Sequence, residues 1–144
     1  MTEAVSYEQF LEQNGSLTYT NVGVSMLPLL RQRRDLFIVK KKGEERCRRG
    51  DVVLYHRPPD QYVLHRIIEV RPEDYVLLGD NCVKKEYGIR DEDILGVMTG
   101  FVRNGKEHQV SEPAYRIYRA VWLHTIALRV FMKRAVHWIK RRFA

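Results

Sequence analysis

The sequence predicts a mainly β (α+β) fold, in which a coiled antiparallel sheet follows a short helix and precedes a basic amphipathic helix. Short runs rich in β-branched and aromatic residues predict the sheet, and most are joined by short connections without a helical pattern between them. The C-terminal segment has apolar residues at helical spacing among many cations. With 144 residues and 44% hydrophobic content, the chain suits one globular unit with a modest core.

The expected elements follow one another in a simple order. A capping box that starts at Ser6 predicts a short helix over Tyr7–Gln13, which stops at Gly15. Leu17–Val24 is expected to be the first strand, and the segment after Ser25 a short helix. The later strands are expected at Leu36–Lys40, Asp51–Tyr55, Tyr62–Val70, Tyr75–Leu78 and Ile94–Arg103, with a hairpin turn at Asn104-Gly105.

Charge divides the chain in two at Glu112-Pro113. Residues 113–144 contain eight Arg or Lys residues and no Asp or Glu, although the whole chain has a net charge of only +7. The first 112 residues are therefore close to neutral. We expect residues 1–112 to form the β domain and residues 113–144 to form a C-terminal helix. Any partner that is attracted by positive charge should bind to this helix.

The expected C-terminal helix has one apolar face. This face consists of Ile117, Val121, Leu128, Met132, Ala135, Ile139 and Phe143. Such a helix suits an anionic membrane surface or a protein partner, and the alternative is that it packs on its own domain. No nucleic-acid partner is expected, because too few residues precede Ser25 for a helix-turn-helix module.

Composition also limits the location and the cofactors. Met1–Val5 has neither the charged start nor the apolar run of a signal peptide, and no stretch reaches the roughly 18 to 20 apolar residues of a spanning helix. A cytoplasmic or peripheral membrane location is therefore expected. The two cysteines, Cys47 and Cys82, are too few for a disulfide framework. The histidines lack ligand spacing, so neither a metal nor another cofactor is expected.

Three separate blocks supply a hydroxyl, an imidazole and a carboxylate. Ser25 lies in the first block, His65 in the second and Asp80 in the third. A serine hydroxyl becomes a nucleophile when a base and a group that orients the base lie next to it. Each residue also has a simpler explanation: Ser25 as a helix cap, His65 as a buried core residue and Asp80 as a turn residue.

These blocks resemble the boxes of the signal peptidase clan, which also contains the self-cleaving domains of SOS-response repressors. The resemblance covers Val22–Val102. Its boxes are Ser25–Pro28, Gly50–Val53, His65–Ile67 and Gly79–Asn81, with Ile94–Val97 closing the domain. The His65-Arg66 pair is similar to the archaeal and endoplasmic-reticulum subgroup, since the bacterial housekeeping enzymes and the repressors have a lysine in this box.

The resemblance implies a serine endopeptidase with a signal-peptidase-like fold. Ser25 would be the nucleophile, and His65 would be the general base and later the general acid. The histidine subgroup has a further Asp six residues after the aspartate of Gly-Asp-Asn, where this chain has Glu86. Either Asp80 or Glu86 is therefore implied to orient the imidazole.

Two further features depart from the family pattern. Many signal peptidases have a hydroxyl residue two positions before the nucleophile, where this chain has Gly23. The oxyanion is therefore expected to be held by backbone N–H groups around Gly23, Ser25 and Met26. The usual N-terminal membrane anchor is also missing, which argues against a housekeeping role in secretion.

The implied substrate is an extended, signal- or leader-like peptide that pairs as an added strand beside the cleft. A different class of function is a regulatory or binding domain that keeps this fold with little turnover. A third possibility is a membrane-active basic helix that the β domain carries. The thiol of Cys82 suggests a Cys-His pair, but a small half-buried side chain is the simpler interpretation.

Overall fold

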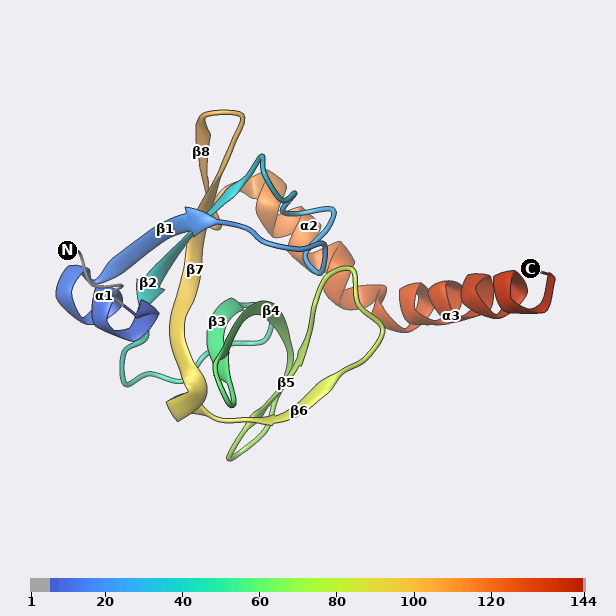
Figure 1. The fold of residues 1–144 in the computed structure, drawn as a ribbon, viewed down its shortest axis with the longest axis horizontal. Coiled ribbons are helices and arrows are strands. Elements are labelled where there is room, and N and C mark those ends of the chain that lie inside the picture. The colour runs from blue at the N-terminus through green and yellow to red at the C-terminus, as the bar shows by residue number, and fades with distance from the viewer. Residues whose placement is uncertain (1–5, 144) are drawn as a thin grey trace.

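Eight strands form one antiparallel sheet in the order β1-β2-β7-β3-β4-β5-β6, with β8 paired to β7 (Figure 1). The computed structural model describes residues 6–143, so Met1–Val5, where no signal peptide is expected, lies outside the described residues together with Ala144. The strands are β1 Ser16–Thr20, β2 Leu36–Lys41, β3 Val52–Arg57, β4 Gln61–Val70, β5 Tyr75–Leu78, β6 Glu86–Ile89, β7 Ile94–Arg103 and β8 Lys106–Gln109. The sheet is open, and the predicted mainly β fold with a helix at each end is confirmed.

The first helix, α1 (Tyr7–Asn14), matches its prediction to within one residue. The backbone N–H of Gln9 donates to the Ser6 hydroxyl at 3.1 Å, and the Ser6 N–H donates to the Gln9 side chain at 3.2 Å. Gly15 ends the helix with a φ of 77°, a left-handed conformation that glycine adopts without strain. Local capping chemistry therefore determines both ends of this helix.

The first strand is shorter than expected. β1 ends at Thr20 rather than at Val24 because the chain leaves the sheet at Asn21. This asparagine is buried, and its side-chain amide donates to the carbonyl of Leu30 at 3.3 Å. The contact ties the start of the next loop to its end.

The short helix predicted after Ser25 is wrong, because this segment forms turns. The N–H of Leu27 donates to the carbonyl of Val24, and one helical bond joins the N–H of Leu30 to the carbonyl of Met26. Pro28 stands between these bonds and has no N–H to extend a helical ladder. The segment is therefore a turn-rich loop, which we call the nucleophile loop (residues 21–30) after the role expected of Ser25.

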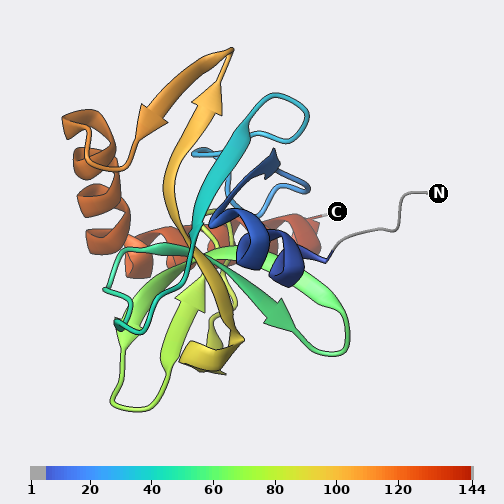
Figure 2. The ribbon, with the colours of Figure 1, turned by 90° about the vertical axis from the view of Figure 1, so that its left-hand side faces the viewer.

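β3 lies between two apolar cores. Val52 and Leu54 belong to the larger core, and Val53 and Tyr55 to the smaller one, because alternate side chains of a strand point to opposite faces. The larger core also receives side chains from α1, the nucleophile loop and the C-terminal region. Figure 2 shows how strongly the sheet curls around these cores.

A short 3₁₀ helix (Asp91–Asp93) leads from β6 into β7. β6, a four-residue edge strand at Glu86–Ile89, is not among the predicted strands, and none of its residues is fully buried. β6 pairs antiparallel with β5 in an irregular register. Its first residue, Glu86, is thereby brought back toward the centre of the sheet.

The C-terminal region forms two helices instead of the single one expected. α2 spans Pro113–His124 and α3 spans Ile126–Phe143. The helical bonding breaks at Thr125, whose φ of −111° and ψ of 12° are not helical. The guanidinium of Arg129 donates to the carbonyl of Trp122 at 2.7 Å and replaces the amide N–H that a continuous helix would supply there.

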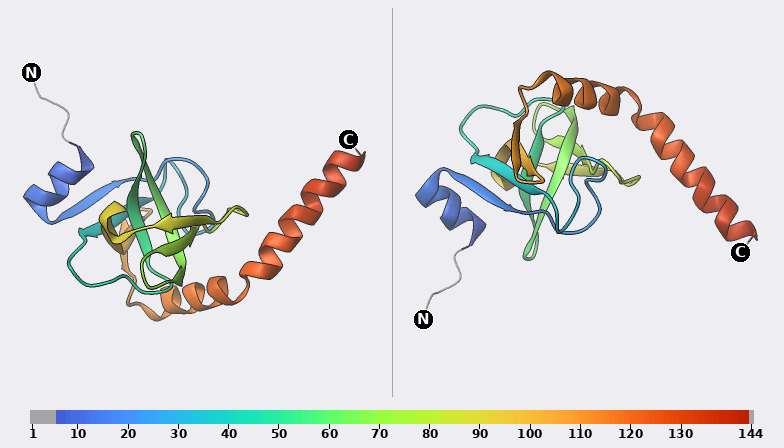
Figure 3. Two further views of the ribbon diagram at one scale, coloured as in Figure 1. Left: turned by 90° about the horizontal axis from the view of Figure 1, so that it is seen from below. Right: turned by 90° about the horizontal axis from the view of Figure 1, so that it is seen from above.

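The two C-terminal helices relate differently to the sheet. Tyr115 of α2 is buried in the larger core, so the expected boundary at Glu112-Pro113 does not separate two cores. α3 continues beyond the sheet as a projecting rod (Figure 3). Within residues 6–143, no helix is both long enough and apolar enough to cross a bilayer.

Candidate active site

The turn after β5 holds the nucleophile loop. The backbone N–H of Asn81 donates to the carbonyl of Ser25 at 2.8 Å. The side-chain amide of Asn81 donates to the carbonyl of Val24 at 3.0 Å, across 57 positions of sequence. The Gly79–Asn81 box and the Ser25 box are therefore in direct contact, and Ser25 itself is half-buried.

The β3–β4 register places His65 on the face of the smaller core. His65 lies opposite Val53 on β3, and Tyr55 follows Val53 on the same face. His65 is largely buried, with 7% of the surface of the residue exposed. His65 and Tyr55 are thus diagonal neighbours on adjacent strands.

Gly79 allows the imidazole and the nucleophile loop to approach one another. A Cβ atom on Gly79 would lie 2.9 Å from Nε2 of His65 and 2.8 Å from the carbonyl oxygen of Ser25, closer than real Cβ contacts. Ser25 and His65 both line one cleft of about 520 Å³. Within the described residues no hydrogen bond joins the Ser25 hydroxyl to His65.

A tyrosine connects His65 to Glu86. The Tyr55 hydroxyl lies 3.3 Å from Nδ1 of His65 and 2.7 Å from Oε2 of Glu86. A carboxylate only accepts hydrogen bonds, so the single hydroxyl proton points to Glu86 and the hydroxyl oxygen accepts from Nδ1–H. These directions assign the tautomer of His65 that has no proton on Nε2, the nitrogen next to Gly79.

Glu86 also lies near the imidazole directly. Its Oε1 is 3.5 Å from Nδ1 of His65. The carboxylate forms an ion pair with Arg57, whose guanidinium also donates to the Tyr55 hydroxyl at 3.4 Å. Glu86 is thus held by two partners while it faces the imidazole.

The surroundings of His65 and Tyr55 favour the protonation states that the assigned His65 tautomer requires. Burial lowers the pKa of His65 below its usual value, and the carboxylate of Glu86 opposes part of this shift. Burial and the adjacent Glu86 raise the pKa of Tyr55 well above its usual value. At neutral pH His65 is therefore a neutral base and Tyr55 keeps its proton.

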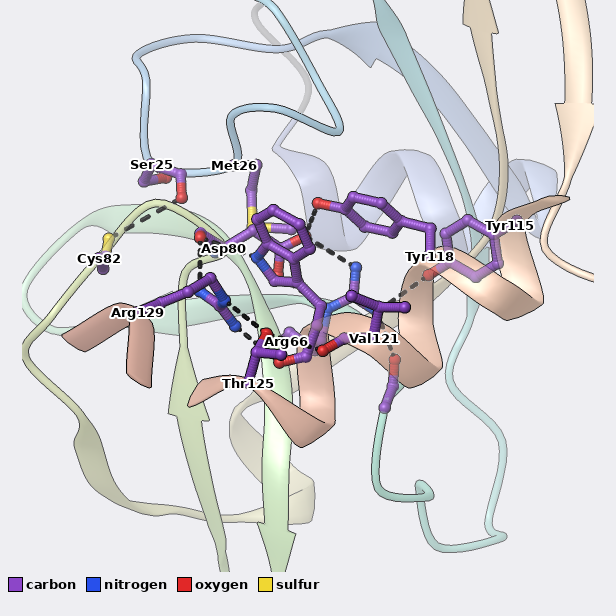
Figure 4. A network of polar contacts seen from close by, with 12 residues as sticks. Ser25, Met26, Arg66, Asp80, Cys82, Tyr115, Tyr118, Val121, Thr125 and Arg129 are labelled. Carbon is purple, nitrogen blue, oxygen red and sulfur yellow. Dashed lines mark hydrogen bonds and ion pairs between the residues drawn. The ribbon is translucent and has the colours of Figure 1, made fainter. Parts of the chain in front are cut away.

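Asp80 has a different position from Glu86. Both of its carboxylate oxygens accept from Arg66, at 2.8 and 2.9 Å, and Tyr118 donates to one of them at 2.7 Å (Figure 4). Asp80 and Arg66 are almost completely buried. Asp80 makes no hydrogen bond to His65 in the described part of the chain, so of the two acids only Glu86 is placed to orient the imidazole.

The buried pair is well matched electrostatically. Burial disfavours the charge on Arg66, but the hydrogen bonds and the negative charge of Asp80, together with Tyr115, outweigh this and raise the pKa of the guanidinium. Arg66 also donates to the carbonyl of Gly50 at 2.8 Å and to the Tyr115 hydroxyl at 3.1 Å. The pair therefore joins α2 to the face of the sheet opposite His65.

The C-terminal helices also contact the turn that holds the nucleophile loop. The carbonyl of Asp80 accepts from the Trp122 indole at 2.9 Å and from Arg129 at 3.1 Å. The ammonium group of Lys133 donates to the carbonyl of Asn81 at 2.5 Å. Side chains of α2 and α3 thus support the turn from behind, on the side away from the cleft.

The expected oxyanion donors are not equivalent. The N–H of Gly23 donates to the side chain of Gln32 at 3.1 Å, so this group is occupied. In residues 6–143 the N–H groups of Ser25 and Met26 have no acceptor. The last two are therefore available to hold a negative oxygen.

Cys82 lies at the cleft but is a poor nucleophile. Its sulfur is 3.9 Å from the carbonyl oxygen of Ser25, and burial raises the pKa of its thiol.

No group of three or more His, Cys, Asp or Glu residues with the geometry of a metal site occurs in residues 6–143.

The cleft has room for an extended chain. It is bordered by the end of β1 and the first half of β4, with Ser25 and His65 between them. The residues that line it from these two segments are Thr20, Asn21, Val22, Gln61, Tyr62, Val63 and Leu64.

Sequence reasoning did not identify Tyr55, Arg57, Tyr118 or Arg129 as parts of this arrangement. Tyr55 is the second residue after the Gly-Asp-Val-Val box, two positions from Val53 on the same face of its strand. Its meeting with His65 depends on a strand register that one sequence does not reveal.

Comparison of the chain with protein-family models, with curated proteins and with solved structures gave no match.

Proposed function

We propose that the protein is a serine endopeptidase of the signal-peptidase type, which cleaves signal- or leader-like peptides. The main support is the chain of hydrogen bonds from His65 through Tyr55 to Glu86. These hydrogen bonds leave Nε2 of His65 unprotonated, and His65 lines the same cleft as Ser25. A neutral imidazole next to a serine is the arrangement that general-base activation of the hydroxyl requires.

The proposed reaction has two halves. The Ser25 oxygen attacks the carbonyl carbon of the peptide and its proton passes to Nε2 of His65. The N–H groups of Ser25 and Met26 bind the resulting oxyanion. The imidazolium then gives its proton to the leaving amine as the C–N bond breaks, which leaves an acyl-enzyme.

Water completes the cycle. His65 accepts a proton from a water molecule as the water oxygen attacks the ester carbon. The bond to the Ser25 oxygen breaks, the serine recovers its proton from His65, and the peptide acid leaves. In both halves the Tyr55–Glu86 pair holds the imidazole and stabilises its transient positive charge.

An extended substrate fits the cleft better than a folded one. The cleft follows the end of β1, an edge strand whose outer side has no strand partner in the described chain. A peptide added along this edge would pass Ser25 with its backbone hydrogen-bonded and its side chains alternating between the two faces.

A regulatory or binding domain with little turnover is the second candidate. The observation that favours it is the missing hydrogen bond between the Ser25 hydroxyl and His65. Catalytic hydrogen bonds are often long in unliganded structures and tighten when substrate binds, so this observation weighs less than the assigned tautomer.

An activated serine can be tested without a known substrate. The protein is incubated with a fluorophosphonate, and the modified residue is located by mass spectrometry. We expect one adduct at Ser25, lost in Ser25→Ala and in His65→Ala and retained in the matched control Ser111→Ala, which changes an exposed serine. No adduct in the folded wild-type protein would favour the binding domain.

We also propose a peripheral location at a membrane surface. The support is α3, which combines exposed apolar side chains with cations and contains no acidic residue.

A further inference from the structure

The apolar side chains of α3 are exposed on one side of the helix. At about 100° per residue they fall within about 160° of its circumference. These exposed residues are Leu128, Phe131, Met132, Val136, Trp138, Ile139 and Phe143. Two of its aromatic side chains, Phe131 and Trp138, are 69% and 59% exposed. The described residues of the protein therefore leave this apolar face uncovered.

The attachment of α3 to the rest of the protein is polar. Arg129 and Lys133 hold the helix through backbone carbonyls of the turn after β5. Both lie outside the apolar arc, about 20° and about 60° beyond its Val136 edge, so these contacts leave the arc exposed. Beyond Lys133 the helix projects from the sheet (Figure 3).

Exposed cations flank the apolar face. Arg134, Lys140 and Arg141 lie on the opposite arc, and all three are exposed. Arg142 falls within the apolar arc, where its guanidinium lies 5.8 Å from the centre of the Trp138 ring. No described ion pair involves these four cations, and residues 113–144 contain no acidic residue that would neutralise them.

The charge distinguishes between possible occupants of this face. A second copy of α3 would cover the apolar arc but would place cations next to cations, a repulsive arrangement. An anionic bilayer accepts the apolar side chains at its acyl boundary and offers negative headgroups to the flanking cations. The lipid surface therefore satisfies both features of the helix.

We propose that α3 docks on an anionic membrane surface, with its apolar face buried at the acyl boundary and its cations among the headgroups. The first half of the helix lies beside the nucleophile loop, because Leu27 and Pro28 line a pocket together with Arg129 and Met132. Docking would thus hold the loop that carries Ser25 near the bilayer. The inference concerns lipid binding alone, so it stands or fails independently of peptidase activity.

The test is co-sedimentation of the full chain with vesicles of phosphatidylcholine alone or mixed with phosphatidylserine. We expect at least about tenfold tighter binding to the anionic vesicles at low salt, weakening as salt rises. Arg134→Glu/Lys140→Glu/Arg141→Glu should lose most of this binding. The matched control Lys40→Glu/Lys84→Glu/Lys106→Glu makes the same charge change at exposed lysines of the β domain and should keep it.

A second variant tests the apolar face. Phe131→Ser/Trp138→Ser should also reduce anionic binding at least about tenfold, with its helix content checked by circular dichroism. Equal binding to both vesicle types, or equal loss in the lysine control, would overturn the proposal. Self-association of the wild-type protein that the Phe131→Ser/Trp138→Ser variant abolishes, without selective anionic binding, would show a second copy to be the occupant.

Discussion

The hydroxyl of Tyr55 lies 3.3 Å from Nδ1 of His65, and it reaches this position from the neighbouring strand. The imidazole therefore contacts an acid mainly through a tyrosine. The arrangement differs from a simple triad because a neutral hydroxyl lies between the base and the carboxylate, while the direct Glu86 contact is longer, at 3.5 Å. It makes Tyr55 a positioning residue for the proposed reaction.

Tyr55→Phe should lower kcat by about tenfold to a hundredfold, because His65 loses the acceptor that selects its tautomer. KM should change little, since Tyr55 is not among the residues that line the cleft. The matched control is Tyr75→Phe, which removes a buried hydroxyl bonded to Cys47 and Asp91 away from His65. Steady-state kinetics on one peptide compare the two, and equal rate losses would contradict the proposed role.

Glu86→Gln should shift the pH dependence as well as the rate. His65 must be neutral to act as a base, so activity falls as the pH drops through its pKa. Burial places this pKa below the usual value of about 6.5, and the negative charge of Glu86 raises it in part. Without that charge, the acid limb of the kcat/KM profile should move to still lower pH while the maximum falls. A limb that moves to higher pH would show that Glu86 does not face the imidazole.

Ser25→Ala and His65→Ala should each abolish most peptide cleavage, and the double variant should be little worse than either. The two groups act as one unit, so their losses are not additive. The comparison uses kcat/KM for the three variants on the same peptide. Independent, multiplicative losses would argue against the pairing, and wild-type turnover in Ser25→Ala would end the serine mechanism.

Asp80→Asn should act mainly on stability. The change leaves the buried charge of Arg66 without its carboxylate partner, which costs about 3 kcal/mol of unfolding free energy. Asp74→Asn is the matched control, because it breaks a solvent-screened pair with Arg71 and should destabilise the protein much less. Urea unfolding of the two variants measures the difference, and similar losses would contradict a structural role for the Asp80–Arg66 pair.

Local signals in the sequence were sufficient for much of the fold. The capping box at Ser6 and the glycine at position 15 delimit α1 because these interactions lie within one turn of chain. Period-two runs located most of the strands, but β6 escaped because an edge strand buries few side chains. The break at Thr125 was not predicted either. There the side chain of Arg129 donates to the carbonyl of Trp122, which the break leaves without its helical N–H partner.

By itself the sequence determined which chemical groups are present: a serine, a histidine and two acids in ordered boxes, and a cationic amphipathic segment. Only the tertiary structure decided how they are used. Strand register brought Tyr55 and Glu86 to His65, and placed Asp80 on the opposite face with Arg66. The apolar face of α3 was visible in the sequence, but its exposure was not. Arg129 and Lys133 bind the turn after β5 and so set which side of α3 faces the rest of the protein. Such choices depend on contacts between distant segments, and one-dimensional periodicity carries no information about them.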